Sequence, residues 1–275
     1  MPDTMPPSRV VRCTQHPGKL DSKALEPVDQ LLLILPERIP AALWKRIPQG
    51  SRLQALLKKR AKGELPALQT RLSNKRQTLV VAGRIKPGED AFARLSFARR
   101  LVGSALGEKA GSLGIAILGF DSDNERDLAE AAVAAALAAS FNLPEFKEKA
   151  TPPRVRSVRL LGLAEHIDLD RTIAEAKGNN LARWLTALPP NVLDAANYAD
   201  GLKKLAAEHG WQFKRYSTKE LEKMGAGAFL AVAQGNDNDS ASIVRLRYRP
   251  GKASAKPDLS LVGKGIIFDA GGTNL

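Results

Sequence analysis

The sequence predicts an α/β protein with two α/β domains joined by a linker helix. Short, continuous apolar runs of strand length alternate with longer segments of helical periodicity, which is typical of parallel sheets covered by helices. The 275 residues exceed the ~100–200 residues of a usual single domain. Residues 1–110 carry 21 Lys and Arg against 9 Asp and Glu, whereas residues 111–275 carry 21 against 20, so the two parts differ in charge.

Composition excludes several classes of protein. With 44% hydrophobic and 26% charged residues, the chain is neither disordered nor of low complexity. A single cysteine, Cys13, excludes a disulfide framework and a cysteine-based zinc finger. No apolar run reaches the ~18 residues of a membrane helix, and the polar, proline-bearing start is unlike a secretory signal. We therefore expect a soluble cytoplasmic protein without a membrane partner.

Residues 27–165 are predicted to form the first domain, after a flexible, proline-rich leader over 1–26. Three apolar runs indicate strands, at 31–35, 78–82 and 114–118, and an alternating segment at 155–161 indicates the last strand of this domain. Helical spacing or composition indicates helices at 40–47, 52–60, 90–106 and 124–141. The last of these is alanine-rich and acidic at its start, where Asp123 or Asn124 is expected to cap it.

Residues 166–190 are predicted to be the linker helix, capped by Asp168 or Asp170 and ended by two prolines. The second domain begins at residue 191. Its predicted helices are 195–209, ended by Gly210, and 218–224, opened by a capping box at Ser217 or Thr218. Alternating or apolar runs indicate its strands, at 211–216, 229–233, 242–249 and 259–262.

The last fifteen residues carry the most informative chemistry. Lys264 stands between two glycines, and Asp269 follows five residues later before Gly271 and Gly272. On a straight strand these two side chains point to opposite faces, so a shared site requires a bulge, which the glycines permit. The spacing fits neither a phosphate-binding loop nor a dinucleotide fingerprint. From the residues alone, a glycine-interrupted strand with a lysine–aspartate ion pair is an equal alternative.

Three segments resemble a known family in the same order. The run GKGIIFDAGG resembles the signature strand of the leucyl aminopeptidase (cytosol aminopeptidase) family, commonly written VGKGxTFDSGG. Residues 180–192 resemble its NLAR…TPPN segment, and Met224-Gly with residues 229–235 resembles its MG-x-FLAVxQG strand. Ile267 and Ala270 replace the usual threonine and serine. Residues 1–165 match the family only in general architecture.

The resemblance implies a metal-dependent aminopeptidase, a hydrolase that releases leucine-like N-terminal residues from peptide substrates by two-metal activation of water. It implies two divalent ions per subunit, manganese or zinc, with Lys264 ligating one metal and Asp269 bridging both. It also implies a homo-hexamer. The catalytic lysine and arginine are expected beyond Leu275, so the second domain is expected to be truncated and the chain inactive alone.

A basic binding module is the alternative function. Residues 1–110 have a net charge of +12, and the densest basic run contains Lys58, Lys59, Arg60 and Lys62. Such a run can bind nucleic acid by neutralising phosphates, although the absence of aromatic residues between Leu53 and Ala91 argues against base stacking. The three histidines, His16, His166 and His209, are isolated and are interpreted as structural.

Overall fold

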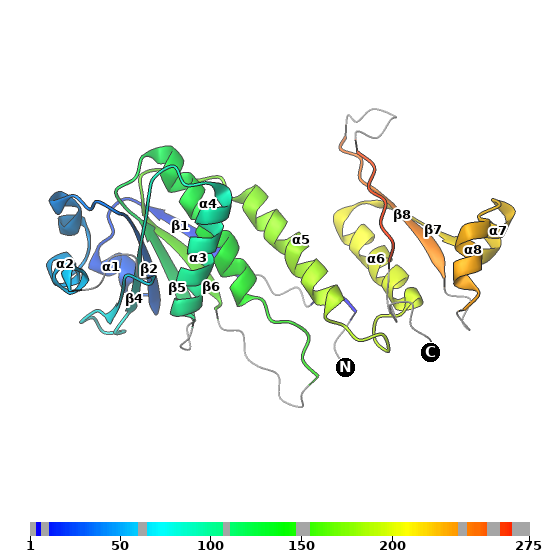
Figure 1. The fold of residues 1–275 in the computed structure, drawn as a ribbon, viewed down its shortest axis with the longest axis horizontal. Coiled ribbons are helices and arrows are strands. Elements are labelled where there is room, and N and C mark those ends of the chain that lie inside the picture. Colours follow the sequence, from blue (N-terminus) through cyan, green and yellow to red (C-terminus); the bar gives the residue numbers. More distant parts are fainter. Residues whose placement is uncertain are drawn as a thin grey trace. The chain divides into compact units, whose positions relative to one another are not determined.

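The computed structural model describes residues 4–6, 11–59, 65–106, 111–146, 155–235, 241–251 and 259–265. The chain divides into two compact units (Figure 1). The N-terminal unit comprises Ser8–Leu143 and Glu148–Ala182; the C-terminal unit comprises Arg183–Leu275 with Met1–Pro7 and Pro144–Lys147. The division falls inside the helix expected to link two domains. Within the described residues, no helix combines the length and apolarity needed to cross a membrane.

A six-stranded sheet forms the centre of the N-terminal unit. Its strands are β1 (Arg12–Pro17), β2 (Gln30–Pro36), β3 (Leu68–Arg71), β4 (Leu79–Ile85), β5 (Ser112–Ile117) and β6 (Ser157–Leu163). They are ordered β1-β6-β5-β2-β4-β3, and only β3 pairs antiparallel with its neighbour. The predicted α/β class is confirmed.

Helices cover both faces of this sheet, which explains why β2 and β5 are continuous apolar runs. Helices α3 (Ala91–Ala105) and α4 (Ser122–Ser140) pack on one face with Leu32, Ile34 and Val81 (Figure 1). On the opposite face, the alternate residues Leu31 and Leu33 pack with α1 (Ser22–Leu25), the 3₁₀ helix η1 (Ala41–Arg46) and α2 (Gly50–Lys58). Because both faces of such a strand are buried, its residues are apolar throughout and do not alternate between apolar and polar.

Local polar contacts fix the starts of the helices. The carboxylate of Asp90 accepts a hydrogen bond from the Ala93 backbone N–H at 2.8 Å and begins α3. Asp121 caps α4 through the Asn124 backbone N–H, also at 2.8 Å. The prediction of Asp123 or Asn124 as this cap was wrong, because α4 begins at Ser122 and its Ncap therefore lies one residue earlier.

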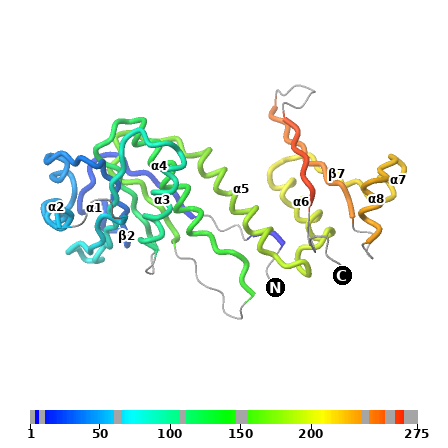
Figure 2. Tube along the Cα trace, viewed as in Figure 1, coloured from blue at the N-terminus to red at the C-terminus, as the bar shows by residue number. Residues whose placement is uncertain are grey.

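The flexible leader predicted over residues 1–26 was wrong for residues 12–25. Strand β1 pairs in parallel with β6 from Arg12↔Ser157 to Pro17↔Leu163, and α1 follows it. In Figure 2 this blue segment runs beside the green trace of β6, at the edge of the sheet. Strand β3 was also not predicted. Both β1 and β3 are edge strands with polar residues, so they lack the apolar run that reveals a central strand.

In the C-terminal unit, the described residues form two short strands and three helices besides the end of α5 (Asp170–Thr186). Its elements are α6 (Ala195–His209), β7 (Gln212–Ser217), α7 (Thr218–Lys223), α8 (Gly227–Ala233) and β8 (Ser242–Arg247). Strands β7 and β8 pair antiparallel. Gly210 ends α6 in the left-handed conformation at φ 68°, and Ser217 with Glu220 forms the capping box of α7, as predicted.

Two predicted strands of this unit were wrong. Residues 229–233 lie in helix α8, and residues 259–262 have no regular secondary structure. A short apolar run fits a helix or a strand equally well, and it becomes a strand only when a partner strand pairs with it. In the described residues of this unit, β7 and β8 pair only with each other.

Candidate functional site

The segment that carries Lys264 lies against helix α6. Residues 259–265 are exposed, and so is the Lys264 side chain. A Cβ atom placed on Gly265 would lie 3.4 Å from Cε1 of Tyr198, which is an ordinary van der Waals distance, so the backbone here passes close to the aromatic ring. Asp269, the second expected metal ligand, lies outside the described residues.

The other resembling segments are placed on three further elements. Residues 180–183 belong to the last turns of α5, and residues 188–192 form the turn that follows it. In that turn the backbone N–H groups of Val192 and Leu193 both donate to the Pro189 carbonyl, at 2.9 and 3.0 Å. Met224 is the exposed Ccap of α7, and residues 229–233 lie in α8.

The described residues do not form a complete metal site. Among them, no group of three or more His, Cys, Asp or Glu side chains is arranged to hold an ion. The amine of Lys264 and the carboxylate of Asp269 are suitable donors in kind for manganese or zinc, but a catalytic divalent ion needs about three protein ligands. The two donors therefore fit a metal centre chemically and are too few to build one.

The basic run expected to bind nucleic acid is only partly described. Lys58 and Lys59 are exposed at the end of α2, whereas Arg60 and Lys62 lie outside the described residues. Nearby Arg52 is used within the fold, since its Nη1 donates to the Arg71 carbonyl at 3.1 Å. Two exposed lysines at a helix end are also what a solvated surface shows.

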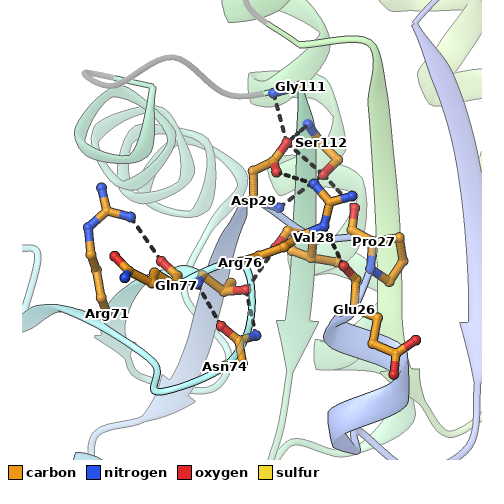
Figure 3. Close-up of polar contacts among 11 residues, drawn as sticks. Glu26, Pro27, Val28, Asp29, Arg71, Asn74, Arg76, Gln77, Gly111 and Ser112 are labelled. Atoms are coloured by element: carbon orange, nitrogen blue, oxygen red, sulfur yellow. Dashed lines mark hydrogen bonds and ion pairs between the residues drawn. The ribbon is translucent and has the colours of Figure 1, made fainter.

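A network of polar contacts that the sequence analysis missed joins the amino ends of β2, β4 and β5 (Figure 3). One carboxylate oxygen of Asp29 accepts from the backbone N–H groups of Gly111 and Ser112 at 3.0 and 2.9 Å. The other oxygen lies 2.7 Å from Nη1 of Arg76. Thr78 Oγ1 donates to the Val28 carbonyl at 2.8 Å.

Burial alone would raise the pKa of Asp29, but the hydrogen bonds from Arg76, Ser112 and Gly111 outweigh it and lower that pKa below its usual value. Ligands of open α/β sheets bind at the carboxyl ends of the strands, and this network lies at the amino ends. We therefore interpret it as structural. The signal in the sequence was a polar residue directly before each apolar run: Asp29 before β2 and Ser112 at the start of β5.

Comparison with known proteins points to one family. Residues 180–275 match the family model described as "Cytosol aminopeptidase family, catalytic domain". A probable cytosol aminopeptidase of Prochlorococcus marinus (strain MIT 9313) is 36% identical over 237 residues, covering 82% of this chain and 47% of that protein. One from Sulfurihydrogenibium sp. (strain YO3AOP1) is 41% identical over 113 residues, covering 41% of this chain and 21% of that protein.

Solved structures show the same fold. A mutant of tomato leucine aminopeptidase superposes with a TM-score of 0.77 at 18% identity, covering 97% of this chain and 56% of that one. The bottromycin maturation enzyme BotP in complex with Mn gives a TM-score of 0.59 at 19% identity, covering 82% and 46%. This chain spans less than half the length of the curated relatives it matches. These comparisons give no support to the alternative of a basic binding module.

Proposed function

We infer that this chain belongs, through residues 180–275, to the cytosol aminopeptidase family, and we infer its function from that membership. The protein is proposed to be an aminopeptidase, a hydrolase that releases N-terminal amino acids from peptides with a preference for leucine-like residues. The observation that carries this proposal is the match of the segments at 180–192, 224–235 and 263–272, in order, inside the matched catalytic domain. The names of the relatives support a cytoplasmic location.

Lys264 and Asp269 are proposed to be two of the ligands of a divalent metal centre. A lysine amine binds a metal only in its neutral form, whereas the aspartate carboxylate is ionised at neutral pH and can bridge two ions. When bound, two such ions would supply an activated water and polarise the scissile carbonyl. The Mn complex of BotP supports manganese, and the donor types also allow zinc. Two ions per subunit and a homo-hexamer remain proposals.

The decisive assay uses the full-length enzyme. It should hydrolyse leucine amide in the presence of Mn²⁺ or Zn²⁺, and a chelator should abolish the activity reversibly. Lys264→Gln and Asp269→Asn should each lower kcat by more than ~100-fold and reduce the metal bound per subunit, because each removes a ligand. Lys223→Gln is the matched control: it removes an exposed lysine of the same unit and should change neither quantity.

Activity that resists chelation, or a Lys264→Gln enzyme with normal metal content, would contradict the proposed metal site. A metal-loaded enzyme that leaves leucine amide and N-terminally unblocked peptides intact would contradict the proposed reaction. Measuring metal content and turnover on the same samples separates these two failures.

A further inference from the structure

A pocket of about 310 Å³ lies at the β1 edge of the sheet in the N-terminal unit. It is lined by side chains from three places: His16 on β1, Arg159 on β6, and Lys19, Asp21 and Lys23 in and around α1. Its volume is at the lower end of the ~300–1,000 Å³ that is typical of small-molecule sites. All these residues precede the segment matched by the catalytic-domain model.

The register of the sheet explains why these side chains converge. In the parallel pairing of β1 with β6, Thr14 is opposite Arg159 and His16 is opposite Leu161. Leu161 is buried in the same hydrophobic cluster as Leu25 of α1. Because side chains two residues apart on a strand share a face, Arg159 and His16 emerge on the face that α1 covers. Lys23 on α1 and Lys19 just before it complete the pocket.

The charge of this pocket is unbalanced. Arg159, Lys19 and Lys23 bring three positive charges, against a single acidic lining residue, Asp21. One oxygen of Asp21 is already used, since it accepts from the Ala24 backbone N–H at 2.8 Å and caps α1. In the described part of the chain, the ion pairs involve other residues and leave these three cations without an acidic partner.

Arg159 has donor capacity that the fold does not use. Its Nη1 faces Nε2 of His16 at 3.3 Å, a long contact to a neutral acceptor, because His16 can accept there only in the tautomer protonated at Nδ1. Its Nε is buried and has no acceptor within the described residues. Guanidinium groups with free donors in one plane match oxyanions by paired hydrogen bonds.

We propose that this pocket binds a small phosphate-type oxyanion, either inorganic phosphate or a small phosphomonoester. Three cations from different elements suit a dianion with several acceptor oxygens better than a monovalent carboxylate, which offers two oxygens in one plane. This function is separate from the proposed aminopeptidase reaction, and it gives His16 a place in a binding site rather than a purely structural one.

The test is calorimetric titration of the full chain with inorganic phosphate and with glycerol 3-phosphate, at pH 7.5 and constant ionic strength, with chelator present. We expect saturable binding at one site per chain. Arg159→Gln should weaken it at least 10-fold, and Lys23→Gln several-fold. Lys75→Gln is the matched control, because it removes an exposed lysine of the same unit outside the pocket, and it should leave binding unchanged. Lys264→Gln should also bind normally, which separates this site from the proposed metal centre.

Thermal melts without ligand establish that each variant is folded. If Arg159→Gln is destabilised, Lys23→Gln decides the matter, since this residue is exposed and forms no ion pair with the described acidic residues. The proposal is overturned if neither phosphate probe binds saturably, or if Lys75→Gln weakens binding as much as the pocket variants do. Equal binding of acetate at the same ionic strength would refute the assignment to phosphate chemistry. Binding of inorganic phosphate but not of glycerol 3-phosphate identifies the free ion as the ligand, and the reverse identifies the ester.

Discussion

Replacing Asp29 by alanine should lower the free energy of unfolding of the N-terminal unit by more than the loss of one exposed ion pair would. The Asp29 side chain is 30% exposed and accepts two backbone hydrogen bonds at the start of β5, besides its contact with Arg76. A third contact, 3.1 Å from Ser112 Oγ, adds little, because that hydroxyl has one proton and donates it to the Pro27 carbonyl at 2.6 Å. The substitution would therefore leave the N–H groups of Gly111 and Ser112 without their acceptor.

The magnitude follows from these contacts. A buried hydrogen bond to a charged group contributes ~1.5–3 kcal/mol, and we take about 1 kcal/mol for each of the two because water reaches this partly exposed carboxylate. The ion pair with Arg76, whose side chain is 48% exposed, adds ~0.2–1 kcal/mol. Asp29→Ala should thus lower the free energy of unfolding by about 2–3 kcal/mol. Arg76→Ala, the control, removes the ion pair and the hydrogen bond to the Glu26 carbonyl and should cost about 1 kcal/mol.

The assay is urea unfolding monitored by hydrogen exchange of the β2 and β5 amides, which report on the N-terminal unit alone. Folding lowers the pKa of Asp29, so its contribution is present above the unfolded-state pKa of about 3.9 and is lost as the pH falls through the lower folded-state value. The difference between the wild type and Asp29→Ala should therefore be full at pH 7 and shrink below pH ~4. A penalty no larger than that of Arg76→Ala, or one that persists unchanged in acid, would refute this reasoning.

Three further substitutions test individual local interactions. Gly210→Ala should destabilise the C-terminal unit by about 1 kcal/mol in thermal melts, because residue 210 has φ 68° and alanine is strained there. Ser217→Ala should cost ~1 kcal/mol by removing the capping box of α7, and Ser217→Thr should retain most of it. Burial raises the pKa of Glu125, which is only 9% exposed, so folding favours the protonated form of this side chain. The contribution of protonated Glu125 to the free energy of unfolding is present below the unfolded-state pKa and is lost as the pH rises through the folded-state pKa. Glu125→Gln should consequently stabilise the N-terminal unit at pH 7 and have little effect at pH 4. A variant less stable than the wild type at pH 7 would contradict this, and would show that the hydrogen bond from the Ala164 N–H to the carboxylate stabilises the fold more than burial of the charge destabilises it.

Much of the fold could be predicted because burial determines the sequence pattern of the central elements. Strands β2 and β5 are covered on both faces, so their apolar runs predicted both the presence of these strands and their parallel pairing. The capping box at Ser217 and the glycine at 210 predicted helix ends correctly, because both signals depend only on residues that are neighbours in the sequence. Strand β1 escaped detection because its pairing depends on β6, about 145 residues later, and its polar side chains carry no comparable signal.

For the candidate metal site, the sequence suggests a chemistry but not a geometry. Lys264 and Asp269 are proposed as metal ligands only because they resemble a family motif, since five residues on a straight strand place two side chains on opposite faces. The structure places Lys264 in an irregular, exposed segment against Tyr198, not on a strand. Strand alternation therefore does not determine the direction of the Lys264 side chain.

The two candidate sites of this chain differ in how the sequence encodes them. The proposed metal ligands lie in one short segment, so a contiguous motif with its glycines suggests them. The oxyanion pocket is assembled from His16 and Arg159, which are 143 positions apart and meet only because β1 and β6 are neighbours in the sheet. No local pattern distinguishes these residues from solvated surface charges, and a histidine that was isolated in the sequence becomes part of a cationic cluster once β1 pairs with β6. The observation that locates this pocket is therefore a set of three cations that the fold brings together without an acidic partner. Substitution of Arg159 is the most direct test of the proposed oxyanion binding.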